Sequence, residues 1–111
     1  MGYMMNISVI QSHLRDDEIL AQMAEEAAEL AQACLKLRRA IRQDNPTPIS
    51  AEDAARDLEE EWADVALCAT VLRYQYQPNP ERVDRNMMYK AKRWADRLQG
   101  IKPPAEGGGD P

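Results

Sequence analysis

The sequence DDEILAQMAEEAAELAQACLKLRRAIR, residues 16–42, decides the fold class because no part of it interrupts an α-helix. Strong helix formers fill most positions, and the stretch contains neither Gly nor Pro. Acids open it and arginines close it, which matches the two ends of a helix dipole. It therefore predicts one long helix from Asp16 to Arg42, ended by DNPTP at residues 44–48.

Two more helices are predicted after this one. Ser50 is a typical N-cap for a helix that runs to about Tyr76. Asn79 can cap the last helix, which has Pro80 at its first position and ends near Gln99. The chain has no Phe and few β-branched or aromatic runs, so nothing favours strands. We therefore expect an all-α fold.

Three segments divide the chain. Residues 1–15 are predicted to form an N-terminal arm with room for a short helix over residues 8–14, capped by Ser8. Residues 16–99 are predicted to form one all-α domain, which suits a chain of 111 residues. The Pro- and Gly-rich residues 100–111 are predicted to be a flexible tail.

The charge distribution limits the classes of partner. The net charge is −5, and residues 16–76 hold 14 acidic and 6 basic side chains, whereas residues 81–99 hold 3 acidic and 6 basic. An acidic body with one basic helix disfavours binding to duplex nucleic acid. The chain shows no apolar run of transmembrane length, no signal peptide and no disulfide framework. We expect a cytoplasmic protein with no membrane partner.

Two pairs of acids carry the strongest functional signal. Glu26 and Glu29 lie in EEAAEL, and Glu61 and Asp64 lie in EEEWADV. Residues three apart on a helix are neighbours, and both pairs lie along the same border of their helix's apolar stripe. If the helices pack antiparallel, four carboxylates meet, and they favour a hard cation such as Mg²⁺. Taken alone, the pattern fits a solvated acidic face equally well.

A polar stripe on the last predicted helix complements the acids. Asn86, Lys90, Arg93 and Arg97 recur at helical spacing. Basic side chains arranged in this way bind phosphate oxygens, although a solvated basic face has the same pattern. Next to the acids, the stripe predicts a site where a metal and basic residues meet a phosphate.

These motifs resemble the MazG-like all-α nucleoside triphosphate pyrophosphohydrolases, which are marked by E-x-x-E, a spacer and E-x-x-D. The resemblance covers most of residues 16–99 and extends to KAKRWADRL near the end of the last helix. It implies a helical bundle whose core and site are completed in a homodimer or homotetramer. Leu67 and Val71 also lie opposite the main apolar stripe of their helix, and a helix that is apolar on two sides predicts at least a dimer.

The resemblance also implies a reaction and residue roles. Family members cleave a (deoxy)nucleoside triphosphate between the α- and β-phosphates and release a monophosphate and pyrophosphate. All four acids would be catalytic ligands of Mg²⁺, with Mn²⁺ as a substitute. Lys90 and Arg93 would bind the substrate phosphates, together with Arg97 and Asn86 of the same stripe.

Several roles stay open at this level. Glu60 or one of the ligand carboxylates can accept the proton from water. Trp62 and Trp94 can stack on a nucleobase, but both border apolar stripes, so core packing is the favoured interpretation. Cys34 and Cys68 are expected to be small buried thiols.

Two other functions compete with this one. The first is a non-catalytic helical oligomer that binds a nucleotide or a protein. The second is a phosphoribosyl-ATP pyrophosphohydrolase, a tighter relative that typically has a His soon after its second acidic element. ADVALC, residues 63–68, contains no His, so this alternative ranks lower. The 31 residues between Glu29 and Glu61 also exceed the family's usual spacer.

Overall fold

The structure, a computed structural model, describes residues 2–43 and 49–103. The described residues form helices and connecting turns, with no strand among them. The elements in chain order are α1 (Tyr3–His13), α2 (Asp16–Arg42), α3 (Ala51–Val71), the 3-10 helix η1 (Tyr74–Tyr76) and α4 (Pro80–Leu98). The prediction of an all-α fold is confirmed.

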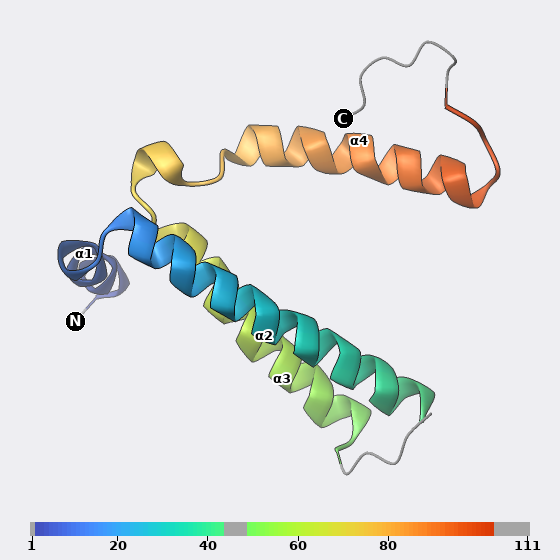
Figure 1. Cartoon of the computed structure of the whole chain (residues 1–111), viewed down its shortest axis with the longest axis horizontal. Coiled ribbons are helices and arrows are strands. Elements are labelled where there is room, and N and C mark those ends of the chain that lie inside the picture. The colour runs from blue at the N-terminus through green and yellow to red at the C-terminus, as the bar shows by residue number, and fades with distance from the viewer. Residues whose placement is uncertain (1, 44–48, 104–111) are drawn as a thin grey trace. The chain divides into compact units, whose positions relative to one another are not determined.

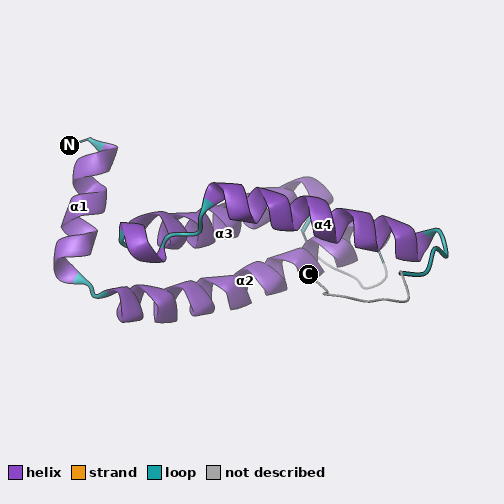
Figure 2. Ribbon diagram, turned by 90° about the horizontal axis from the view of Figure 1, so that it is seen from above, coloured by secondary structure: helices purple, strands orange, loops and turns teal. Residues whose placement is uncertain are grey.

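The chain divides into two units, Met1–Gln77 and Pro78–Pro111. In the first unit, α2 and α3 lie side by side and run in opposite directions, as Figures 1 and 2 show. The short helix α1 contacts α3. The second unit contains α4, which has no buried residue. The predicted antiparallel packing of the two acidic helices is therefore present within the first unit.

The core of the first unit lies where α1 meets α2 and α3. Its buried residues are Ile7, Ile19, Cys68, Val71 and Leu72, and Ile19 is only 2% exposed. Further along the helical pair the buried residues are alanines, which let two helix backbones approach closely. The apolar core is thus concentrated at one end of α2 and α3.

Two helix boundaries differ from the predictions. Helix α1 begins at Tyr3 with Gly2 as its cap, so Ser8 lies inside the helix and caps nothing. Helix α3 ends at Val71 and not near Tyr76. Leu72 turns to an extended backbone there, and the amide of the next residue, Arg73, donates to an Asp16 carboxylate oxygen at 3.2 Å.

The other predicted boundaries agree with the structure. Helix α2 spans the predicted residues. Ser50 accepts a hydrogen bond from the Asp53 amide and caps α3, and Asn79 accepts one from the Arg82 amide and caps α4. The predicted helix break at residues 44–48 and most of the predicted tail, residues 104–111, lie outside the described residues.

Candidate metal centre

The interface between α2 and α3 follows a repeat of three and four residues. On α2 the buried and half-buried positions include Ile19, Met23, Glu26, Leu30, Ala33, Leu37 and Ala40. On α3 they include Ala54, Leu58, Glu61, Val65 and Cys68, and buried Leu72 follows directly after the helix. Such positions form the apolar seam of a helix pair. Each helix thus places one glutamate, Glu26 or Glu61, where an apolar residue is normally found.

This seam is rotated relative to the apolar stripe predicted for α2. Helical periodicity predicts a stripe of Ile19, Leu20, Met23, Ala27, Leu30, Cys34, Leu37 and Ile41. Of these, Leu20, Cys34 and Ile41 are exposed. The seam instead uses Ala33 and Ala40, which are buried. The prediction placed both acid pairs at the border of the interface. Because the seam is rotated, the first acid of each pair, Glu26 or Glu61, lies within the interface instead.

Three carboxylates meet at this point of the seam. One oxygen from each of Glu26, Glu29 and Glu61 lies within 4.8 Å of the other two. The Gln22 side-chain amide donates a hydrogen bond to Glu26 Oε2 at 2.6 Å. Glu61 Oε1, in contrast, is buried and has no hydrogen-bond partner among the described residues. A buried carboxylate oxygen without a partner is unfavourable, and a bound cation would satisfy it.

The charge of the cluster acts most strongly on Glu61. Burial raises the pKa of its carboxyl group, and the negative charges of Glu29, Asp64, Glu26 and Glu60 raise it further. A divalent cation would reverse this effect by compensating the negative charge. Three carboxylates are also the hard oxygen donors that Mg²⁺ prefers, and Mg²⁺ keeps several of its own waters. The residues present therefore fit a magnesium ion.

Two other predicted residues lie near the cluster without belonging to it. Asp64 is exposed and is not part of the three-carboxylate group. Its charge nevertheless raises the pKa of Glu61 and of the Cys68 thiol, so it lies on the cluster's side of α3. Glu60 is exposed, and its charge also raises the Glu61 pKa. The structure thus brings three of the four predicted ligands together.

A polar hollow adjoins the cluster on the α2–α3 pair. Its volume is about 270 Å³, and its lining residues are Glu29, Gln32, Ala33, Lys36, Arg39, Asp57 and Glu61. Lys36 Nζ lies 3.2 Å from an Asp57 carboxylate oxygen. Lys36 and Arg39 were not among the site residues predicted from the sequence. Lys36 follows Glu29 by seven residues, which returns it to the same face of the helix, and this spacing would have identified it.

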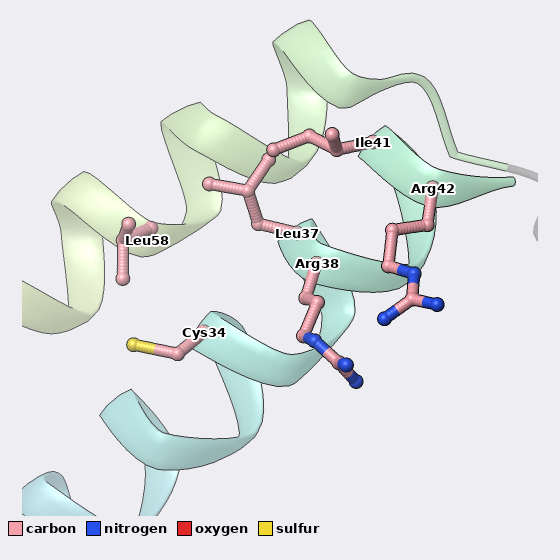
Figure 3. A pocket seen from close by; sticks show the side chains of 6 residues that line it. All are labelled: Cys34, Leu37, Arg38, Ile41, Arg42 and Leu58. Carbon is pink, nitrogen blue, oxygen red and sulfur yellow. The ribbon is translucent and has the colours of Figure 1, made fainter. Parts of the chain in front are cut away.

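A second hollow on the same two helices has a different character. It measures about 320 Å³ and is shown in Figure 3 with its six lining residues, Cys34, Leu37, Arg38, Ile41, Arg42 and Leu58. Its lining holds no carboxylate. The neighbouring residues Arg38 and Arg39 therefore line different hollows.

The predicted phosphate-binding residues lie on α4, in the second unit. Asn86, Lys90, Arg93 and Arg97 are all exposed there, and their role beside the acids stays a prediction. Trp62 on α3 is 65% exposed and Trp94 on α4 is 64% exposed. Core packing was favoured for both tryptophans, but neither is packed in the core of this chain.

The two cysteines behave differently from each other. Cys68 is buried in the core, as expected, whereas Cys34 is exposed and lines the hollow of Figure 3. The prediction of a buried thiol is wrong for Cys34 because the seam is rotated away from it. Burial raises the pKa of Cys68, and the charges of Glu26 and Asp64 add to the effect.

Comparisons with known proteins identify no relative of this chain. No family model, no curated protein and no solved structure matches the chain. Within the described residues, no helix has the length and apolar character needed to cross a lipid bilayer.

Proposed function

We propose that this protein is a Mg²⁺-dependent nucleotide pyrophosphohydrolase that cleaves a (deoxy)nucleoside triphosphate into a monophosphate and pyrophosphate. The observation that carries the proposal is the cluster of Glu26, Glu29 and Glu61, whose oxygens approach within 4.8 Å around a buried oxygen that has no described partner. The resemblance of the two acid pairs to MazG-like enzymes gives the reaction class.

The proposed roles follow from the positions of the side chains. Glu26, Glu29 and Glu61 hold the metal, and Asp64 completes the acidic site from the next turn of α3. When bound, Mg²⁺ neutralises phosphate oxygens and lowers the pKa of a coordinated water. Glu60, exposed beside Glu61, would accept the proton of the attacking water. Lys90 and Arg93 of α4 are proposed to bind the substrate phosphates.

The proposed active form is a homodimer or homotetramer. Both units expose large apolar side chains, among them Trp62, Ile41, Met88 and Leu98, and exposed apolar surface of this extent is typical of an interface. The prediction that Val71 faces a partner chain is wrong, because Val71 is buried in the cluster that includes Ile7 of α1. Light scattering after size exclusion tests the assembly, and a strictly monomeric protein would contradict it.

The reaction itself is tested by pyrophosphate release from a panel of ribo- and deoxyribonucleoside triphosphates, with and without Mg²⁺. Metal-dependent release with a monophosphate as co-product is the expected result. Glu26→Gln should reduce turnover at least about 100-fold because it removes a metal ligand. Glu25→Gln is the matched control, since Glu25 is an exposed acid outside the cluster. Equal losses in the two variants would contradict the assignment.

A further inference from the structure

The hollow beside the three carboxylates carries two cations that the proposed function does not yet use. Lys36 and Arg39 line it together with Glu29 and Glu61. Side chains on a helix lean toward its N-terminus, so both cations of α2 lean from their own turns back toward the cluster. All of these residues belong to the first unit, and the hollow is therefore built within one chain.

The two cations are held in different ways. Lys36 is fixed by its 3.2 Å ion pair with Asp57 across the α2–α3 interface, and both side chains are about two-fifths exposed. The Arg39 guanidinium has no hydrogen bond or ion pair within the part of the chain that the structure describes. A planar group with five donors that faces a polar hollow is suited to a bidentate oxyanion.

The charges that line the hollow favour an anion only when a cation is bound at the cluster. The lining holds three carboxylates, from Glu29, Asp57 and Glu61, against two cations, so the metal-free hollow carries net negative charge and repels a phosphate. With Glu26 of the cluster counted, four carboxylates stand against two cations, and one divalent ion would neutralise this net charge of −2. The repulsion would then be removed, and a polyanion would contact the metal at one end and Lys36 and Arg39 at the other.

We propose that Lys36 and Arg39 form the subsite for the terminal phosphates of the substrate, the part that leaves as pyrophosphate. This inference rests on the proposed function and deepens it, because it assigns the leaving-group end of the substrate to α2. It also predicts an order of binding, in which the metal enters before or with the polyphosphate.

Inorganic pyrophosphate is the probe, because it carries no base or sugar whose identity is unknown. Isothermal titration measures Mg²⁺ alone and then pyrophosphate at saturating Mg²⁺. Lys36→Gln and Arg39→Gln are expected to weaken pyrophosphate binding about 10-fold or more, as for other charge-assisted hydrogen bonds. Arg38→Gln is the matched control, since Arg38 lines the other hollow, and less than a twofold change is expected. Mg²⁺ affinity should not weaken in any of the three, since none of them removes a metal ligand and the loss of a nearby cation favours Mg²⁺.

A variant that is expected to bind pyrophosphate more tightly separates a loss of the subsite from a loss of folding. Asp57→Asn removes a competing negative charge and should tighten pyrophosphate binding several-fold; weaker binding would contradict the subsite. If the wild type hydrolyses nucleotides but the Lys36 and Arg39 variants bind pyrophosphate normally, the subsite is wrong and the proposed function stands. If the wild type binds no Mg²⁺, the proposed function fails and the subsite falls with it.

Discussion

Replacing Glu61 with Gln should change stability in opposite directions with and without metal. The Glu61 pKa is raised by burial and by four neighbouring acids, so the folded chain holds its proton more tightly than the unfolded chain does. Stability is therefore lost as pH rises from the ordinary carboxyl pKa, about 4.3, through the raised value. Gln cannot ionise, so the metal-free variant should be more stable than wild type at pH 7 and should gain nothing at pH 3.

Magnesium should reverse that ranking. A ligand at 100 times its dissociation constant stabilises a protein by about 2.7 kcal/mol, which is roughly 10 °C for a domain of this size. Loss of one of three carboxylate ligands should weaken Mg²⁺ affinity at least about 100-fold, because mutating even a residue that only hydrogen-bonds to a ligand typically weakens metal affinity 10–100-fold. The variant is then only near half-saturation at the same Mg²⁺ concentration, and its gain falls to roughly 2 °C.

Thermal unfolding at pH 7 measures both quantities in one plate, with and without Mg²⁺. Glu59→Gln is the matched control, since it removes an exposed acid of the same helix that is not part of the cluster. It should resemble the wild type in both conditions. If Glu61→Gln lowered the metal-free melting temperature, the carboxylate would be stabilising the fold, and the argument for a strained acidic site would be refuted. An unchanged Mg²⁺ response would remove Glu61 from the metal site.

Three further predictions concern the rest of the first unit. Ile19→Ala should lower the free energy of unfolding by about 2–5 kcal/mol in urea denaturation, because the side chain is 2% exposed; a loss below about 1 kcal/mol would contradict its central place in the core. Arg73→Gln removes the 2.9 Å ion pair to Asp16 and the bonds to carbonyls at the end of α1, so amide exchange should speed up in α1 more than in α2, and uniform acceleration would count against this anchor. A thiol reagent should modify exposed Cys34 rapidly but buried Cys68, whose pKa is raised, only on unfolding; equal rates would contradict this.

Local signals in the sequence were sufficient for most helix boundaries. Ser50 and Asn79 cap their helices as predicted, because a cap depends on residues within three positions of it. The end of α3 depends instead on Asp16, which lies 57 residues away from Arg73 and binds it at 2.9 Å. Apolar periodicity continues past this point, so no local pattern could reveal where the helix stops.

The acidic site was partly predictable because helical spacing, like a helix cap, is a local property of the sequence. Helical spacing alone placed both acid pairs on matching faces, and the structure brings Glu26, Glu29 and Glu61 together. The rotation of the seam escaped prediction because Ala33 and Ala40, which are buried in it, contribute little to a hydropathy pattern. The cations predicted for the site were those of the basic stripe on α4, whereas the cations that line the hollow, Lys36 and Arg39, lie on the same helix as two of the acids.

Glu61 is an exception to the apolar packing between α2 and α3. Two other acids of α3 are paired with nearby cations: Asp57 with Lys36 at 3.2 Å, and Asp53 with Arg56 at 2.9 Å. At Glu61 the described structure instead offers a buried oxygen without a partner, surrounded by other acids. Substituting an apolar residue there would complete the seam and remove the repulsion. Local conflicts of this kind in an otherwise consistent chain are typical of functional sites, and this one supports the proposal that a cation binds at the cluster.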